Sequence, residues 1–577
     1  MSRLNSVASL GRRVLPNHWD VIAAAFIFAA LTGFVRGFHG MNAPLPPLDA
    51  PSVSLDTWDL PYYALRTTLR MFAALFFSLI FTFTYATLAA KSRRLEMILI
   101  PVLDILQSVP ILGFLTFTVT FFIGLFPGNV LGAECASIFA IFTSQAWNMA
   151  FSFYQSLRNV PRDLDEVARG FRFTGWQRFW QLEAPFAVPS LIWNTMMSMS
   201  GGWFFVVAAE AITVGDNATV NLPGIGSYIA LANSRGDYMA DVAAVVAMGV
   251  VILAYDQLLF RPVIAWAAKF RVELAAGQSV ERSWVLDLLT RTHWVRAAFR
   301  PVFEIFRRLA LLRIRSPIRF EPDQSRAVKD SGLIDGLWYA ALFGLAAYAL
   351  WKVYDNLHES LGWSDVREVL WLTSITLVRV TVMIVLASLI WVPISVWIGL
   401  RPRLAAAIQP AAQFLAAFPV NLIFGPAVAL VLAFDLNPDI WLSFLMVFGT
   451  QWYIVFNTIG GAMAFPNDLR EAIANFRIRG RDWWTKAILP GVAPAFFTGA
   501  IAASGGSWNA AIVAEVVKWK DQTVSAHGIG AYITQASDKN DLARVALGVA
   551  VMSIFVTFFN RLLWRKLYAY AERRLRL

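Results

Sequence analysis

Apolar segments of about twenty residues recur along most of the chain, and any fold must keep them away from water. A helix of about 20 apolar residues spans a bilayer, because it rises ~1.5 Å per residue. In the first half these segments lie at 19–35, 61–90, 97–126, 133–156 and 186–210, and a sixth ends near 266. In the second half they lie near 334–355, 366–400, 405–433, 438–462, 491–514 and 541–564. The pattern predicts an all-α polytopic membrane protein with about 12 transmembrane helices.

Cations in the short loops sort the two membrane sides. Loops 39–60, 127–132 and 434–437 contain no Lys or Arg, whereas the alternate loops are basic, as at Lys91, Arg158, Arg162, Arg401, Arg403, Arg470 and Lys566. Because basic loops face the cytoplasm, both termini and the basic loops are predicted to be cytoplasmic. The segment 19–35 has the length of a signal peptide, but no small-residue cleavage site clearly ends it, so a permanent first span is favoured.

Composition and motifs exclude several functions. Charged residues make up only 15% of the chain, where a soluble protein carries roughly a quarter. The net charge of +11 follows the loops, so no nucleic acid is expected as a partner. No phosphate-binding loop, metal-ligand cluster or nucleophile elbow occurs, and Cys135 is the single cysteine. We therefore predict no enzyme activity, no cofactor and no metal site in this chain.

One polar motif occurs twice between apolar segments, at 157–185 and 463–490. The second copy matches the first without a gap, each residue lying 305 positions later, as Glu166 and Glu471 do. The paired positions are Pro161/Pro466, Asp163/Asp468, Glu166/Glu471, Phe171/Phe476, Arg172/Arg477, Gly175/Gly480, Pro185/Pro490 and Pro189/Pro494. An internal duplication of the membrane domain explains such a repeat.

Each copy has the pattern of a short amphipathic helix. Asp163 and Asp468 are expected to cap its start, with Glu166 and Glu471 at the spacing of a capping box. Apolar residues recur every three to four positions, at Leu164, Val167, Ala168 and Phe171 and at Leu469, Ala472, Ile473 and Phe476. Gly175 and Gly480 suit a helix stop. A capped surface helix that merely joins two spans is the simpler interpretation, which the second copy disfavours.

These motifs resemble the EAA loop of binding-protein-dependent ABC importer permeases, in Glu166-Val167-Ala168, Glu471-Ala472-Ile473 and Leu489-Pro490. In that family the loop is a cytoplasmic coupling helix that docks into an ATPase subunit. The resemblance implies ATPase coupling by Asp163, Glu166, Ala168, Phe171, Arg172, Gly175, Asp468, Glu471, Ala472, Phe476, Arg477 and Gly480. Where the family has a glycine, this chain has Arg172 and Arg477, which predicts a turn displaced towards Gly175 and Gly480.

The resemblance also implies an architecture and partners. Two six-helix halves of the type I ABC importer fold would occupy 1–266 and 331–577, joined by a basic cytoplasmic linker at 267–330. Arginines interleaved with apolar residues in the linker predict amphipathic helices on the inner membrane face, with a regulatory domain as the alternative. Two ABC ATPase subunits that bind ATP and Mg, and an extracytoplasmic binding protein, would complete a transporter of the bacterial inner membrane.

The repeat continues into the spans after each motif. Glycine and serine cluster beside a tryptophan and precede a carboxylate, which suggests a translocation path built from Ser200, Gly201, Trp203, Glu210, Gly505, Gly506, Trp508 and Glu515. Gly224-Ile225-Gly226 matches Gly528-Ile529-Gly530. Segments 211–240 and 515–540 resemble the family's partly re-entrant outer segment. Arg70 and Arg379 occupy matching second spans and, with Asp104 in the third, are expected to pair or snorkel.

The leading hypothesis is a permease subunit that translocates a small anion such as nitrate, a sulfonate or bicarbonate, as the nitrate/sulfonate/taurine/bicarbonate type implies. A proton-coupled secondary transporter that uses Glu210 and Glu515 is the alternative. A third hypothesis is a membrane scaffold whose basic linker recruits a cytoplasmic partner. Uptake driven by a proton gradient without any ATPase would favour the secondary transporter. Loss of function on deleting most of 267–330 would favour the scaffold.

Overall fold

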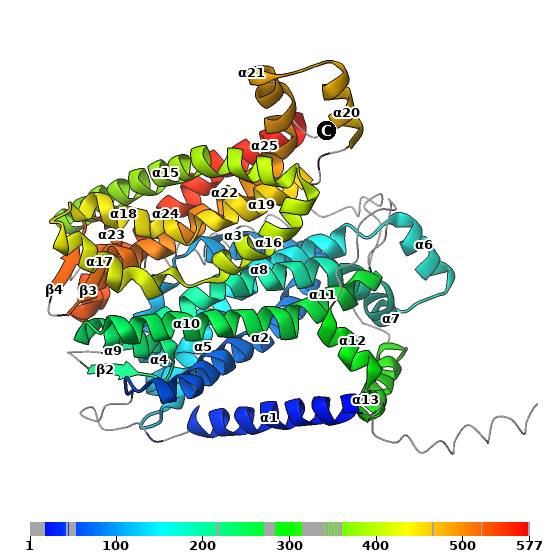
Figure 1. Cartoon of the computed structure of the whole chain (residues 1–577), viewed down its shortest axis with the longest axis horizontal. Helices are drawn as coiled ribbons and strands as arrows, with labels where there is room; N and C mark the ends of the chain where they lie inside the picture. Colours follow the sequence, from blue (N-terminus) through cyan, green and yellow to red (C-terminus); the bar gives the residue numbers. More distant parts are fainter. Residues whose placement is uncertain are drawn as a thin grey trace, which may run out of the picture.

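The computed structural model of the chain describes residues 18–41, 44, 53–214, 218–270, 283–292, 294–313, 361–463, 465, 467–520 and 522–574, and single residues at 340, 344, 348, 351 and 355. Long helices run roughly parallel to one another in a bundle (Figure 1). The predicted span 334–355 lies almost entirely outside the described residues, as residues 1–17 do entirely, so that span and the cytoplasmic location of the N-terminus stay predictions.

The first half contains the long helices α1 (His18–Met41), α2 (Leu60–Lys91), α3 (Arg93–Ser108), α4 (Leu115–Leu125), α5 (Leu131–Arg158), α8 (Ala184–Glu210) and α10 (Tyr238–Tyr255). Between α5 and α8 lie α6 (Arg162–Gly170), α7 (Gly175–Arg178) and the π-helical turn η4 (Phe179–Glu183). The shorter elements are η2 (Thr57–Asp59), η3 (Leu112–Phe114), α9 (Ile225–Arg235), η5 (Asp256–Phe260), α11 (Arg261–Ala267) and η6 (Ala268–Phe270).

The second half repeats this order. Its long helices are α15 (Trp363–Gly399), α16 (Pro402–Ala417), α17 (Phe424–Ala433), α18 (Pro438–Phe448), α19 (Gln451–Met463), α22 (Leu489–Ala514) and α24 (Leu542–Phe559). Its shorter elements are η7 (Val420–Ile423), α20 (Asn467–Asn475), α21 (Gly480–Asp482), the π-helical turn η8 (Trp483–Ile488), α23 (Ile529–Asp538), η9 (Asn560–Trp564) and α25 (Arg565–Arg574). The linker contributes α12 (Trp284–Arg291) and α13 (Trp294–Ala310).

The chain is mostly helical rather than all-helical, which corrects the prediction. Strands β1 (Ala211–Val214) and β2 (Ala218–Asn221) form an antiparallel hairpin after α8, and β3 (Val516–Trp519) and β4 (Gln522–Ser525) form its counterpart after α22. The backbone register pairs Ile212 with Val220 and Val517 with Val524, and β-branched residues favour the extended conformation of a strand.

Six helical segments among the described residues are long and apolar enough to cross a membrane, or eight if two bent pairs count as one span each. The predicted span at 405–433 is broken by 74° between α16 and α17. Pro419 explains the break: the residue before a proline is pushed out of the helical region, and Phe418 is extended with a ψ of 123°. The predicted span at 438–462 is likewise bent, by 41°, between α18 and α19.

The two halves contact each other reciprocally. The backbone N–H of Ile111 donates to Oδ1 of Asn509 at 2.7 Å. The amide of Asn421 donates to the carbonyl of Phe204 at 3.3 Å. Phe204 and Asn509 occupy equivalent places 305 positions apart, and η3 and η7 are equivalent too. The same pair of surfaces therefore meets twice, as a pseudo-twofold axis requires.

Candidate functional site: the paired loops and the buried ion clusters

The repeated motifs lie at one end of the helix bundle. Helices α6, α7, α20 and α21 stand at that end, and the β-hairpins lie at the opposite end (Figure 1). The chain of the first motif turns back into the bundle through η4, and that of the second through η8, both π-helical, before α8 and α22 begin. Each copy of the motif is therefore a loop that projects from the bundle between two long helices.

Phenylalanine ends each projecting helix with its ring in solvent. Phe171 is 70% exposed and Phe476 is 79% exposed, although both belong to the predicted apolar stripe. In the first loop, Ala168 of the same stripe is buried, so the apolar stripe packs against the protein at Ala168 but is exposed at Phe171. Glu166 and Glu471 are also exposed. The loops thus present an aromatic ring and a carboxylate to a surface that the described chain does not cover.

The predicted helix starts are wrong by one or two residues. Helix α6 begins at Arg162 after Pro161, with no side-chain capping bond, and α20 begins at Asn467, so Asp163 and Asp468 lie inside their helices. The capping box occurs in α7 instead, where Thr174 accepts from the N–H of Gln177 at 3.3 Å and donates its own N–H to that side chain at 3.1 Å. Proline fits the start of α6 because it has no N–H to satisfy there.

The turn after each helix has not moved, which corrects a second prediction. Arg172 and Arg477 adopt left-handed backbone conformations, with φ of 53° and 51°. The N–H of Phe173 donates to the carbonyl of Ala168 at 3.1 Å, and that of Ile478 to Ile473 at 3.1 Å, as in a Schellman motif. Gly175 and Gly480 do not stop these helices; they begin the next ones.

Glycine at both left-handed positions is expected to stabilise the protein. A non-glycine residue in this conformation costs about 1 kcal/mol, so the double variant Arg172→Gly/Arg477→Gly should gain up to roughly 1–2 kcal/mol. Thermal unfolding of the full chain in detergent measures the gain. Gly480→Ala is the matched control, because Gly480 has a φ of 63° and should lose stability. An unchanged melting temperature in both would show that the loops do not limit unfolding.

Ion pairs connect the first loop to the end of α2 in the same half. The Lys91 ammonium at the end of α2 pairs with Glu183. Arg178 bridges Glu183 at 3.0 Å and Asp165 at 2.8 Å, and Arg169 joins Asp165 at 2.8 Å. The linker meets the same loop: the indole of Trp176 donates to the carbonyl of Leu309 at 2.8 Å. This chain of ion pairs ties α6 to the end of a membrane helix.

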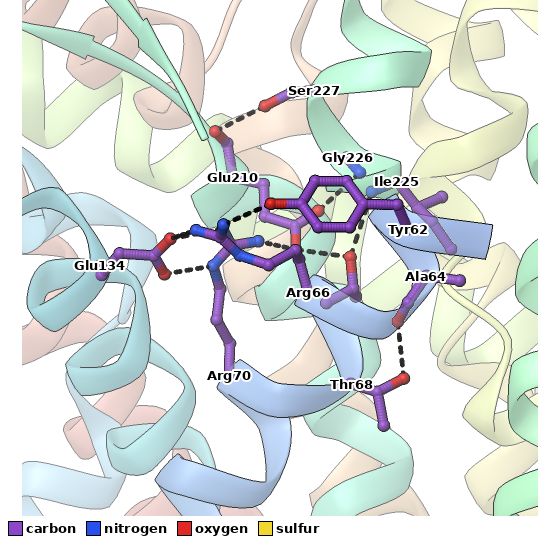
Figure 2. Close-up of polar contacts among 11 residues, drawn as sticks. Tyr62, Ala64, Arg66, Thr68, Arg70, Glu134, Glu210, Ile225, Gly226 and Ser227 are labelled. Carbon is purple, nitrogen blue, oxygen red and sulfur yellow. Dashed lines mark hydrogen bonds and ion pairs between the residues drawn. The ribbon is translucent and has the colours of Figure 1, made fainter. Parts of the chain in front are cut away.

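A second polar cluster is buried in the first half, and Figure 2 shows its contacts. Glu210 accepts from the guanidinium of Arg70 at 2.6 Å, from the hydroxyl of Thr67 at 2.6 Å and from the N–H of Gly226 at 2.7 Å. Arg70 also holds Glu134 at 2.6 Å, and Arg66 pairs with Glu134. Two arginines thus balance the charges of two carboxylates, and all four side chains are at most 1% exposed. The cluster joins the ends of α2, α5, α8 and α9.

The second half has an equivalent ion cluster that is more exposed to solvent. Glu515 accepts from the hydroxyl of Thr376 at 2.8 Å and from the N–H of Ala531 at 3.1 Å. Arg379 lies 3.6 Å from Glu515 and 2.6 Å from Asp439. The position of Arg66 is Ile375 here, four residues before Arg379. One arginine therefore serves two carboxylates, and Asp439 is 37% exposed.

The clusters explain the Gly-Ile-Gly repeat, whose role the sequence left open. A Cβ on Gly224 would lie 2.3 Å from the carboxylate of Glu210, and one on Gly528 would lie 2.2 Å from that of Glu515. Only glycine lets the start of α9 or α23 approach the carboxylate this closely. The arginine in each second span, Arg70 or Arg379, was the sequence signal that could have located the clusters.

The residues predicted for a translocation path are dispersed. Trp203 and Trp508 are 0% and 1% exposed and pack within the cores of the bundle. Ser200 donates to the carbonyl of Met196 in its own helix at 3.0 Å. A Cβ atom on Gly201 would lie 3.0 Å from the hydroxyl of Tyr453, and one on Gly506 would lie 2.7 Å from Thr450, whereas Gly505 faces open space. Glu210 and Glu515 hold helix ends together, and the set as a translocation path stays a prediction.

Comparison with known proteins identifies the membrane domain. The family model of the binding-protein-dependent transport system inner membrane component matches residues 60–260 and 391–577. These stretches contain both loops, the first ion cluster, and Asp439 and Glu515 of the second, so the two halves are two copies of one domain. A multi-pass protein of the inner membrane follows from this match.

The alignments with curated relatives are about as long as one of the two domain copies. The bicarbonate transport system permease protein CmpB of Synechococcus elongatus is 31% identical over 179 residues, 31% of this chain and 61% of CmpB. The nitrate import permease protein NrtB of Leptolyngbya laminosa is 26% identical over 28% of this chain and 52% of NrtB. The glycine betaine/proline betaine transport system permease protein ProW of Escherichia coli is 29% identical over 40% of this chain and 59% of ProW.

The match thus spans roughly half to three fifths of each of these relatives. The family model, in contrast, covers more than half of the chain, in two stretches that follow the internal repeat. With its duplicated helical domain and paired loops, the chain belongs to the family of binding-protein-dependent transport system inner membrane components, ABC importer permeases.

Proposed function

We propose that the chain is the whole membrane subunit of an ATP-driven importer, with one ATPase docked on each of its two loops. The observation that carries this proposal is the pair of exposed phenylalanines, Phe171 and Phe476, at matching helix ends on one end of the bundle. An exposed aromatic ring beside a carboxylate suits an anchor that fills a pocket of a partner. A second copy of the loop supplies the second anchor, so no second membrane subunit is needed.

The same arrangement supports a topology and domain plan. The loops, the basic linker at 267–330 and both termini face the cytoplasm, and the β-hairpins face outward towards a binding protein. The halves 1–266 and 331–577 would carry about 12 spans. Eight are the candidate spans above, α5, α8 and the pair α3 and α4 match spans of the second half, and 334–355 adds the twelfth. ATP and Mg would bind to the ATPases, and no cofactor to this chain.

Opposite charge on both loops tests the coupling. We expect Glu166→Arg/Glu471→Arg to leave the chain folded, because both side chains are exposed, and to abolish co-purification with a candidate ABC ATPase. ATP-dependent uptake into proteoliposomes should fall in parallel, by about tenfold or more. The matched control is Glu304→Arg in the linker, also exposed. Assembly and uptake at wild-type levels would remove the coupling role.

For the solute, we propose a small anion of the nitrate, sulfonate or bicarbonate kind. Support comes from the resemblance of the motif and from two relatives that carry bicarbonate and nitrate in their names. The relative ProW carries glycine betaine and proline betaine in its name, which makes a betaine the second candidate. Thermal shifts of the partner binding protein with bicarbonate, nitrate, taurine and glycine betaine separate the two, since only one class should stabilise it.

A further inference from the structure

The two loops differ in how they rest on the membrane helices behind them. In the first half, a chain of ion pairs among Lys91, Glu183, Arg178 and Asp165 fills the space between α2 and the loop. The equivalent positions of the second half are Leu400, Ile488, Trp483 and Arg470, since α15 follows α2 by 309 positions and the loops differ by 305. The duplication has thus replaced three charged side chains with apolar ones and an aspartate with an arginine.

A cavity of about 130 Å³ occupies this place in the second half, lined by Leu400, Arg470, Ile473, Trp483 and Ile488. Four of these five residues are the replacements. Arg470 donates one guanidinium N–H to the carbonyl of Ala462 at 3.2 Å, while its Nε is buried and has no partner among the described residues. A buried guanidinium N–H without an acceptor is costly, so the cavity is suited to an anion.

A larger cavity of about 450 Å³ adjoins the first and shares Leu400 and Trp483 with it. Its remaining lining is Val396, Trp397, Arg401 and Trp484. The guanidinium of Arg401 lies 4.2 Å over the Trp397 ring and donates to the Trp397 carbonyl at 2.9 Å. Two arginines therefore stand around a joined apolar space at the end of a membrane-spanning helix.

The apolar side of α15 leads out of this space along the membrane. Trp397 is 52% exposed, and Ile394, Ile390 and Leu386, three, seven and eleven residues earlier, are exposed as well. These residues form one stripe of the helix, because three to four residues make a turn. An alkyl chain that lies along this stripe would end at the two cavities.

We propose that the second half binds one anionic phospholipid here, with its phosphate at Arg470 and Arg401 and its acyl chains along α15. Basic pockets between membrane helices bind anionic lipid headgroups, and indole rings favour the headgroup level. A free anion would use the arginines but leave the three tryptophans and the exposed stripe without a partner. At the equivalent place of the first half, the ion pair of Lys91 and Glu183 takes the positions of Leu400 and Ile488.

Lipid titration of the full-length chain tests the site. In native mass spectrometry from detergent, phosphatidylglycerol should bind more tightly than phosphatidylcholine, and Arg470→Gln/Arg401→Gln should weaken phosphatidylglycerol binding about tenfold. The matched control is Arg403→Gln, which removes an exposed charge of the next helix outside the cavities, and should leave binding within about twofold.

A second test places the ion pair of Lys91 and Glu183 at the equivalent positions of the second half. Leu400→Lys/Ile488→Glu should fill the cavity with an ion pair and lower phosphatidylglycerol binding. The melting temperature should fall somewhat, because the desolvation of a buried ion pair costs more than that of the apolar side chains it replaces. Equal binding of both lipids, or full binding by the arginine double variant, would overturn the proposal. Thermal protection by inorganic phosphate equal to that by phosphatidylglycerol would overturn it too, because a lipid would not be required. Neither readout depends on an ATPase, so the result is separate from the coupling role.

Discussion

The double variant Phe171→Glu/Phe476→Glu is expected to lower ATP-driven uptake about a hundredfold or more, the largest effect on transport that the structure predicts. Both rings are exposed at the tips of the loops on which we propose that the ATPases dock, and an aromatic anchor contributes about 2 kcal/mol or more to an interface. Glutamate removes the anchor and brings an unpaired charge to the contact, which adds a desolvation cost. Uptake of labelled solute into proteoliposomes, together with co-purification of the ATPase, measures the effect.

Phe434 provides a matched control for this variant. It is 70% exposed, as Phe171 is, but it ends α17 in the loop at 434–437, among the loops without cations. Phe434→Glu should therefore leave ATPase association and uptake near wild-type levels. If both variants lose uptake equally, the loss reflects general damage to the membrane domain. If the loop variant keeps uptake and its ATPase, the loops are not the coupling elements.

The second large effect concerns stability. Arg70→Met is expected to destabilise the chain by about 3–5 kcal/mol, because it leaves Glu134 and Glu210 buried with too little positive charge. Arg379→Met, at the equivalent place, should cost less, because water screens Asp439, which is 37% exposed. The other carboxylate, Glu515, is buried, but it lies 3.6 Å from Arg379 and keeps its hydrogen bonds from Thr376 and Ala531. The melting temperatures of the two purified variants in the same detergent give the comparison.

A charge-balanced variant keeps this prediction testable if Arg70→Met fails to fold. Arg70→Met/Glu134→Gln retains Arg66 and Glu210 as one cation and one anion, and Glu210 still accepts from Thr67 and Gly226. We expect it to be more stable than Arg70→Met alone. If Arg70→Met and Arg379→Met melt at the same temperature, burial does not decide how much each ion cluster contributes to stability. The contribution of the first cluster to holding the helix ends together is then smaller than its geometry indicates.

Several elements were predictable because their signals are local in sequence. The spans 61–90 and 186–210 correspond to α2 and α8, since twenty consecutive apolar residues can be read without knowing any partner. The loop helices α6 and α20 followed from apolar spacing over one or two turns. Their starts were missed; α6, for example, begins directly after Pro161 without a side-chain cap. The break before Pro419 had a local signal as well, which the span prediction overlooked.

From the amino-acid order alone came the duplication, the apolar spans, the basic loops and the position of both motifs, all of which depend on neighbours along the chain. Packing decided the rest. Arg70 meets Glu210 although 140 residues separate them, and Leu400 meets Trp483 in a cavity where the first half has an ion pair. Such partners lie on different helices, and which faces of those helices meet depends on how all the helices pack together. The turn at Arg172 is the clearest case: arginine there favours no left-handed turn, yet the hydrogen bonds that end the helix impose one.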